Sequence, residues 1–426
     1  MIKPNKQFTL LAGITASVFL LTGACKSDSQ INTITPENYC FVEYPGFPNS
    51  HSTWGDIGYN PHFNSVYIGV TNHADSVGLF EYDIRNDRMT LNGFIGKMAN
   101  LRDFQWQGKI HSKILTGPDN QVYFATDGGE SREEYLMEHP HGYAGGYVMK
   151  WDPATRTLRN LGNLMQYESI KDIEIDNETG NIYAITYPQV HFILYNAAEN
   201  QVKDLGRLGS SHVPRVMFTD KWGNCYYVDW RQRLVKYDKQ AGKLLFDKNP
   251  LPAFPGTPGA KIITGVTAYA KDNERNIIYL ITYGAKIIAF HPQESGIGMV
   301  EDLGGVLPDE FTNNPWGPYC PNLAFGKNGK LYYIVGGHGN FSKDNKTLFM
   351  EFDPETRTHV KLFGFDPVVI AEITGSDVID KDGNIYFAAR KEIPRSSALS
   401  VGEGGGKGTI SKPFMLIFNP EKKIGK

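Results

Sequence analysis

The chain has 426 residues, of which 41% are hydrophobic, 12% aromatic and 21% charged. This is the composition of a folded globular protein, and it excludes disordered, collagen-like and coiled-coil chains. The 43 Lys and Arg residues against 46 Asp and Glu residues give no basic excess, so we expect no nucleic-acid partner. The 4 cysteines include no CxxC pair, which argues against a disulfide scaffold or a structural zinc site.

The N-terminus has the layout of a lipoprotein signal peptide. Lys3 and Lys6 precede an apolar run over 8–21, which is too short for a stop-transfer helix, and Thr22-Gly23-Ala24 stand directly before Cys25. We predict a signal peptide over 1–24 and lipid attachment at Cys25; the alternative is a plain secretion signal.

Residues 25–37 are rich in Ser, Asp, Asn and Thr and predict a flexible tether. Their first residues after Cys25, Lys26-Ser27-Asp28, resemble the sorting signal of outer-membrane or cell-surface lipoproteins. We therefore expect that location, with membrane contact only through the lipid anchor.

A turn followed by a strand with a tyrosine recurs at intervals of roughly fifty residues, the signature of a repeat architecture. The seven tyrosines are Tyr67, Tyr123, Tyr183, Tyr226, Tyr279, Tyr332 and Tyr386. Each is followed by a second strand that ends in an aromatic residue and a polar one: Tyr82-Asp83, Trp151-Asp152, Tyr195-Asn196, Tyr237-Asp238, Phe290-His291, Phe352-Asp353 and Phe418-Asn419. Short β-rich runs between Gly, Asn and Asp turns predict antiparallel strands.

Seven copies of a four-stranded unit predict an all-β, seven-bladed β-propeller with four-stranded antiparallel blades over 38–426. Two separate β-sandwiches would not explain seven copies in register. We expect the strand near Phe41 to complete the seventh blade as its outer strand, and Cys225 to lie in the core. The sequence leaves open whether Cys40 and Cys320 form a disulfide.

Loops between the second and third strands open on the face where the innermost strands begin. They are long in blades six, seven, one and two and short in blades three to five, which predicts a wall beside an open cleft. On this face we expect few acidic residues. The candidate site residues are His111, His139, His141, Tyr187, His212, Arg215, Trp230, Arg231, Tyr283 and His338.

Cations pair with carboxylate or sulfate groups and aromatic rings stack on sugars, so this face suits an acidic polysaccharide or oligosaccharide. Uronic-acid polysaccharides can be cut by β-elimination, for which histidine and tyrosine supply the acid and base. We expect His111, His141 and Tyr187 to be catalytic and Arg215 to bind the uronate carboxylate. The other candidates, His139, His212, Trp230, Arg231, Tyr283 and His338, are expected to bind substrate.

This chemistry requires no cofactor. A divalent metal stays open as an alternative, because His111, His139 and His141 approach one ion if their loop folds back.

Three stretches, "GKIHSKILTGPDNQVYFAT", "GYAGGYVMKWDPATRTLRNLG" and "DIEIDNETGNIYAITYPQVHFILYN", resemble the propeller-fold polysaccharide lyases of the ulvan lyase type. The resemblance is best over blades two to four. It implies that His111 and Tyr187 act with a second histidine and an arginine. Tyr147 stands where that histidine is expected, so His141 is taken as its substitute, and Arg215 is assigned by blade position alone. These departures leave open another substrate or a relative without activity.

The sequence thus predicts a monomeric, surface-anchored lyase that cleaves a uronic-acid-containing polysaccharide, sulfated or unsulfated. The alternative is a non-catalytic propeller lipoprotein that binds a glycan or a protein, because a propeller is a scaffold that does not imply activity.

Overall fold

The computed structural model describes residues 33–47, 50–55, 57–72, 76–128, 142–209, 216–252, 265–283, 285–307, 318–337, 341–394 and 409–425. The predicted signal peptide and most of the predicted tether, including Cys25, lie outside them. The helices described are the 3₁₀ turns Pro36–Asn38 and Asp103–Gln105 and the single turn α1 (Ile95–Met98). None of these is long and apolar enough to cross a membrane.

Strands make up nearly all the regular structure, and we number the blades in chain order. Blade 1 contains β2 (Ile57–Asn60), β3 (Ser65–Thr71), β4 (Val77–Asp83) and β5 (Arg88–Phe94). Blade 2 contains β6 (Lys109–Ile110), β7 (Leu115–Thr116), β8 (Val122–Asp127), β9 (Val148–Asp152) and β10 (Thr157–Gly162). Blade 3 contains β11 (Ser169–Ile175), β12 (Ile182–Tyr187), β13 (His191–Asn196) and β14 (Gln201–Arg207).

The remaining blades follow the same pattern. Blade 4 contains β15 (Phe218–Thr219), β16 (Cys225–Val228), β17 (Arg233–Asp238) and β18 (Lys243–Pro250). Blade 5 contains β19 (Val266–Asp272), β20 (Ile277–Thr282), β21 (Lys286–Pro292) and β22 (Gly298–Gly305). Blade 6 contains β23 (Asn322–Phe325), β24 (Leu331–Val335), β25 (Thr347–Asp353) and β26 (Thr358–Phe365). Blade 7 contains β27 (Glu372–Ser376), β28 (Ile385–Pro394), β29 (Thr409–Phe418) and β1 (Tyr39–Glu43).

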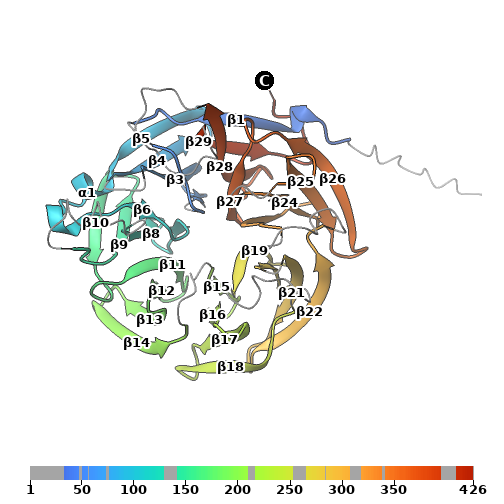
Figure 1. The fold of residues 1–426 in the computed structure, drawn as a ribbon. Coiled ribbons are helices and arrows are strands. Elements are labelled where there is room, and N and C mark those ends of the chain that lie inside the picture. The colour runs from blue at the N-terminus through green and yellow to red at the C-terminus, as the bar shows by residue number, and fades with distance from the viewer. Residues whose placement is uncertain are drawn as a thin grey trace, which may run out of the picture. The chain divides into compact units, whose positions relative to one another are not determined.

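Blades 1 to 5 are separate sheets, and blades 6 and 7 are joined into one by a short parallel pairing of β23 with β27. All other pairings between the named strands are antiparallel. Figure 1 shows the sheets around a common axis, with inner strands such as β11, β15, β19 and β27 nearest to it. The sheets fit seven blades, which agrees with the predicted all-β propeller.

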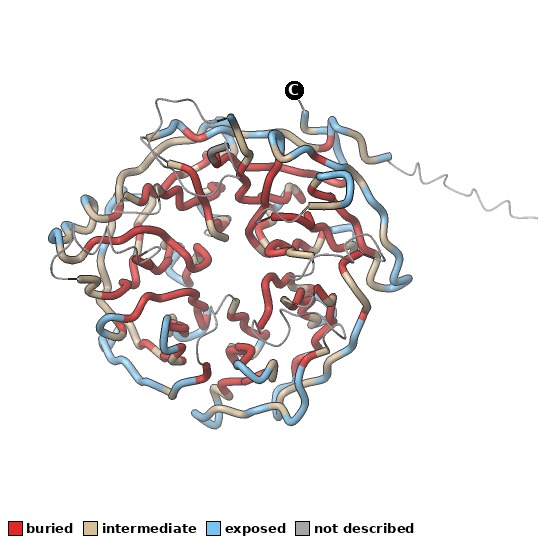
Figure 2. Tube along the Cα trace, in the orientation of Figure 1, coloured by how far each residue is buried: buried red, intermediate tan, exposed pale blue. Residues whose placement is uncertain are grey.

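Hydrophobic clusters fill the spaces between consecutive blades. One cluster joins blades 3 and 4, another blades 4 and 5, and a further one joins blade 7 to blade 1. The remaining four clusters fill the interfaces of blades 1–2, 2–3, 5–6 and 6–7. The seven repeated tyrosines all lie in second strands and are all buried. Figure 2 shows the buried residues on the inner strands and the exposed ones toward the outer strands.

In five blades the polar residue after the third-strand aromatic caps the turn that follows the third strand. Asp83, Asp152, Asn196, Asp353 and Asn419 each accept hydrogen bonds from the backbone N–H groups two and three residues later. This is an Asx turn, which fixes the reversal of the chain. The recurring aromatic–polar pair therefore has a structural cause.

Blade 5 carries His291 at this position and holds its turn differently. Lys236 of the neighbouring β17 is buried and donates to the carbonyl oxygens of Gln293, Glu294 and Gly296, at 2.8–2.9 Å. Burial lowers the pKa of Lys236. A lysine from blade 4 thus replaces the missing cap of blade 5.

β1 closes the ring. It pairs antiparallel with β29 from Tyr39 opposite Phe418 to Glu43 opposite Phe414, so the prediction that the strand near Phe41 completes blade 7 is confirmed. The described residues include Cys40, Cys225 and Cys320, which form no disulfide with one another, and Cys225 is buried as expected.

Candidate functional site

We call the face on which the inner strands begin the upper face. The segments that link second and third strands on this face are short on one side of the ring and long on the other. Residues 188–190, 229–232 and 283–285 link the second and third strands of blades 3, 4 and 5, whereas residues 128–147 do so in blade 2. In blade 7, β28 pairs with the inner strand β27 only up to Arg390. Its pairing with β29 continues four residues further, to Pro394 opposite Thr409, so these two strands extend above the inner strand. Blades 3 to 5 are therefore the low side.

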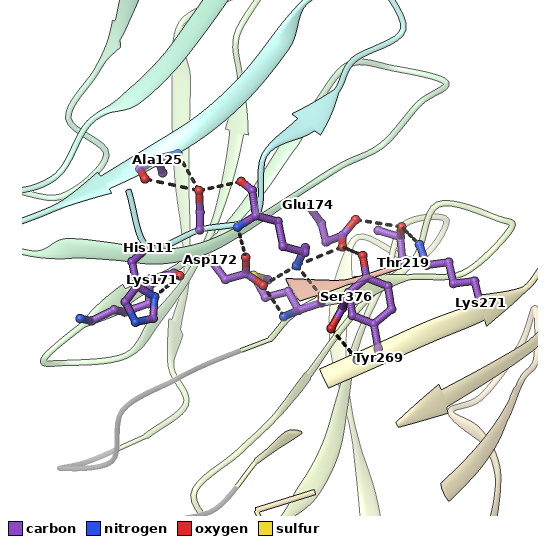
Figure 3. A network of polar contacts seen from close by, with 12 residues as sticks. His111, Ala125, Lys171, Asp172, Glu174, Thr219, Tyr269, Lys271 and Ser376 are labelled. Atoms are coloured by element: carbon purple, nitrogen blue, oxygen red, sulfur yellow. Dashed lines mark hydrogen bonds and ion pairs between the residues drawn. The ribbon is translucent and has the colours of Figure 1, made fainter. Parts of the chain in front are cut away.

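His111 follows β6 and is buried on the upper side of the axis. Its Nδ1–H donates to the backbone carbonyl oxygen of Lys171 in β11, at 2.9 Å (Figure 3). A carbonyl can only accept, so this contact requires the proton on Nδ1 and makes Nε2 the basic nitrogen. The bond to the neighbouring blade also fixes the orientation of the ring.

Lys171 connects His111 to Tyr187, the last residue of β12. The Lys171 ammonium group lies 4.7 Å from the centroid of the Tyr187 ring and forms an ion pair with Asp127. Two of the three predicted catalytic residues, His111 and Tyr187, are thus linked through one lysine.

Asp127 ends β8 and is 1% exposed. Burial raises the pKa of Asp127, but the nearby charges of Lys171, Lys109 and His111 outweigh this effect and hold that pKa well below its usual range. The Lys109 ammonium lies 3.8 Å from the Asp127 carboxylate. A buried lysine requires such a partner, since an unpaired buried charge is strongly destabilising.

A second buried pair, Arg390 with Glu372, stands in blade 7. The Trp54 ring lies 5.6 Å from the Arg390 guanidinium and 5.0 Å from the Lys109 ammonium. The expectation that acidic residues are few on this face is therefore wrong for its inner part, because carboxylates accompany the buried cations.

Further along the axis the polar network continues through Lys113, which forms an ion pair with Asp172 and lies 3.2 Å from Glu174 (Figure 3). Burial lowers the pKa of Lys113, but these carboxylates raise it overall, so the lysine stays charged. The cavity beside His111 and Lys113 measures about 40 Å³. That is room for about one water, so this cavity is too small to hold a larger ligand.

The residue four positions after each strand tyrosine lies at one level of the upper face. In blades 1, 2 and 7 it is Thr71, Asp127 or Arg390, all buried. In blades 3, 4 and 5 it is an aromatic residue with exposed surface, and Trp230 is 49% exposed. The Arg231 guanidinium lies 4.8 Å from the Trp230 ring centroid. Of the predicted substrate-binding residues, Trp230, Arg231 and Tyr283 therefore lie on the low side; Tyr187, from the catalytic set, is their blade-3 counterpart.

The other predicted site residues, His139, His141, His212, Arg215 and His338, lie outside the described residues. In the part of the chain that is described, no group of three or more His, Cys, Asp or Glu side chains is arranged to hold a metal ion. Two of the three histidines considered for a shared metal, His139 and His141, are not in that part.

The sequence interpretation missed Tyr167, which lies between β10 and β11. Its side chain is 65% exposed, and its backbone is left-handed with φ 66°. The adjacent Glu168 carboxylate accepts a hydrogen bond from the Gln189 backbone N–H at 2.9 Å, which ties this segment to the loop after Tyr187. No repeated motif marks Tyr167, whereas alignment of the seven tyrosine repeats would have identified Asp127.

No protein-family model matches the sequence, and no curated protein matches it. Solved structures do match. U3-55K is 9% identical with a TM-score of 0.54, covering 90% of this chain and 99% of that chain. The WD40 repeats of RRP9 are 9% identical with a TM-score of 0.55, covering 91% and 99%. A chain of the mitotic checkpoint complex is 10% identical with a TM-score of 0.52, covering 100% and 99%.

The fold is that of a β-propeller. At this identity the likeness concerns the fold alone. It supports the propeller part of the resemblance found in the sequence and not the ulvan lyase part.

Proposed function

We propose that this protein is a surface-anchored lyase that binds a uronic-acid-containing polysaccharide on its upper face and cleaves it by β-elimination. The observation that carries the proposal is His111: its ring is held by the Lys171 carbonyl, with the proton on Nδ1, beside the Lys171–Tyr187 pair. An oriented histidine next to a tyrosine is a suitable acid–base pair near neutral pH.

In the proposed reaction Nε2 of His111 removes the proton from C5 of the uronate. The electron pair of that C–H bond forms the C4–C5 double bond, and the bond from C4 to the glycosidic oxygen breaks. The Tyr187 hydroxyl donates its proton to the departing oxygen. The charge of Lys171 is neutralised by Asp127, so we assign binding of the uronate carboxylate to Arg215. His141 is proposed as the second catalytic histidine.

The remaining features complete the proposal. A lipid on Cys25 holds a monomer at the outer membrane or cell surface, and the chemistry needs no cofactor. The substrate is an acidic polysaccharide or oligosaccharide, and the protein contacts the membrane only through its anchor.

A second candidate is a non-catalytic propeller that binds a glycan or a protein. It is favoured by the buried pairs Lys171–Asp127, Lys113–Asp172 and Arg390–Glu372, whose charges are used within the scaffold. Such internal pairing suits a rigid binding platform as well as an enzyme.

Incubation of the chain from Ser27 onward with ulvan, oligogalacturonate, alginate and glycosaminoglycans, with and without a chelator, tests the proposal. A rise in ultraviolet absorbance from an unsaturated uronate, abolished in His111→Ala and strongly reduced in Tyr187→Phe, is the expected result. A flat trace from the folded wild type, together with binding on a glycan array, would establish the second candidate instead.

A further inference from the structure

Four aromatic rings follow one another over blades 3 to 5 of the upper face. Tyr187, Trp230 and Tyr283 occupy the same position in three consecutive blades, four residues after the strand tyrosine. Tyr167 precedes them, tied to the loop of Tyr187 by the hydrogen bond between Glu168 and Gln189. We call Tyr167, Tyr187, Trp230 and Tyr283 the aromatic arc.

Tyr187 and Tyr283 are half-buried, but packing of the fold does not account for the other two rings. Trp230 and Tyr167 are 49% and 65% exposed, and both stand among the most exposed large hydrophobic residues described. Tyr167 also adopts a left-handed conformation, with φ 66°, which is unfavourable for a bulky residue. Exposed aromatics and backbone strain of this kind occur at ligand-binding sites.

Two rings of the arc carry a cation at one side. The Lys171 ammonium lies 4.7 Å from the Tyr187 centroid, and the Arg231 guanidinium 4.8 Å from the Trp230 centroid. Lys171 is neutralised by Asp127, whereas Arg231 is exposed and forms no ion pair within the described residues. A sugar that bears a carboxylate or sulfate can contact such an exposed ring and pair with the arginine that lies over it.

We infer that the aromatic arc binds consecutive sugar rings of one acidic saccharide chain, which runs along the low side from blade 3 to blade 5 with its Tyr187 end next to His111. Trp230 and Tyr283 stack on sugar rings further from His111, and Arg231 binds an acidic group on one of them. The inference rests on the substrate class of the proposed function but not on cleavage.

Binding is measured by titration calorimetry with uronic-acid oligosaccharides of increasing length from the panel substrates, in a His111→Ala background so that the ligand is not consumed. Trp230→Ala and Tyr283→Ala are each expected to weaken binding of a long oligosaccharide about tenfold, a typical effect of losing a stacked ring. The affinity of the His111→Ala protein should rise with oligosaccharide length. Tyr167→Ala should weaken binding only of the longer oligosaccharides.

Phe246→Ala is the matched control. Phe246 lies in the outer strand β18, is 46% exposed and has the Arg233 guanidinium 5.5 Å from its centroid, so it is the same kind of ring–cation pair outside the arc. Phe246→Ala should bind the oligosaccharides as tightly as His111→Ala alone. Arg231→Gln should weaken an acidic oligosaccharide but not its carboxyl-reduced, unsulfated form.

The inference about the aromatic arc is overturned, and the proposed function is not, if the wild type binds or cleaves a saccharide while Trp230→Ala and Tyr283→Ala bind it as tightly as His111→Ala alone. The proposed lyase activity is overturned, and the inference about the aromatic arc is not, if binding depends on the arc but the wild type yields no unsaturated product. Absence of binding to every member of the panel overturns both.

Discussion

Blades 2 and 7 can be compared with blades 3 to 5 at one backbone position, the fourth residue after the strand tyrosine. In blades 2 and 7 that residue is Asp127 or Arg390, buried and paired with Lys171 or Glu372. In blades 3 to 5 it is an aromatic residue with exposed surface. Equivalent positions of the repeat thus differ in chemistry: one side of the upper face is a closed polar core, and the other carries aromatic rings with exposed surface.

The two sides follow different rules of stability. A buried ion pair gains little over a hydrophobic pair, but removal of one partner leaves an uncompensated charge. An exposed aromatic ring contributes little to folding, and its loss is felt in binding. Substitutions on the two sides should therefore separate stability from function, and the following predictions test this separation.

The largest effect is expected for His111→Ala, on the closed side. Loss of the base should lower kcat about a thousandfold, within the usual range for a general base. His191→Ala is the control on the low side, where His191 Nδ1 lies 2.8 Å from the Asp204 carboxylate. Initial rates from ultraviolet absorbance measure the effect, and an equal loss in both variants would count against a specific role of His111.

Asp127→Asn should destabilise the fold by about 3–5 kcal/mol, because it leaves Lys171 and Lys109 without their shared carboxylate. Asp366→Asn removes an exposed pair with Lys346, at 2.9 Å, and should cost less than about 1 kcal/mol. Urea unfolding measures both. Similar values for the two variants would contradict the description of the closed side as a buried polar core.

Asp377→Asn should stabilise the fold, in contrast to Asp127→Asn. Burial raises the pKa of Asp377 to about 6, although the nearby charge of Lys271 acts to lower it. The folded state therefore binds this proton more tightly than the unfolded state, and stability falls as pH rises through this window. The variant should be about 1–2 kcal/mol more stable than the wild type at pH 7 and lose the pH dependence between 4 and 6. Thermal unfolding across that range measures it.

The smallest effect is expected where β1 joins blade 7. Hydrogen bonds from Lys391 and Lys412 lower the pKa of Glu43 to about 2. The stabilisation is present above the unfolded pKa and is lost as pH falls toward 2. Because Glu43 is 53% exposed, Glu43→Gln should cost only about 0.5–1 kcal/mol at pH 7, and acid titration of unfolding should show the difference disappear near pH 2.

The fold could be predicted because its signals are local and repeated. The tyrosine of each second strand and the aromatic–polar pair of each third strand stand close together in the sequence, and each has a local cause in burial or in an Asx turn. The low side could also be predicted, because the number of residues between the two motifs of each blade gives the length of the loop between its second and third strands.

The electrostatics of the site could not be predicted in the same way. Lys171 meets Asp127 from a different blade, 44 positions away, and His111 meets the Lys171 carbonyl 60 positions away. Such contacts depend on how neighbouring blades pack. Tyr167 lies between blades, where no motif repeats, so only its exposure and backbone conformation reveal it.

Closure of the ring by β1 also sets the order in which the protein can mature. The Asn38 side chain donates to the Asn419 carbonyl across 381 positions of sequence. A chain that emerges from the ribosome N-terminus first keeps β1 without its partner until β29 has been made, while the intervening blades can already fold. β1 is therefore an unpaired edge for most of synthesis, and a chaperone or a protease has its longest access to the protein there.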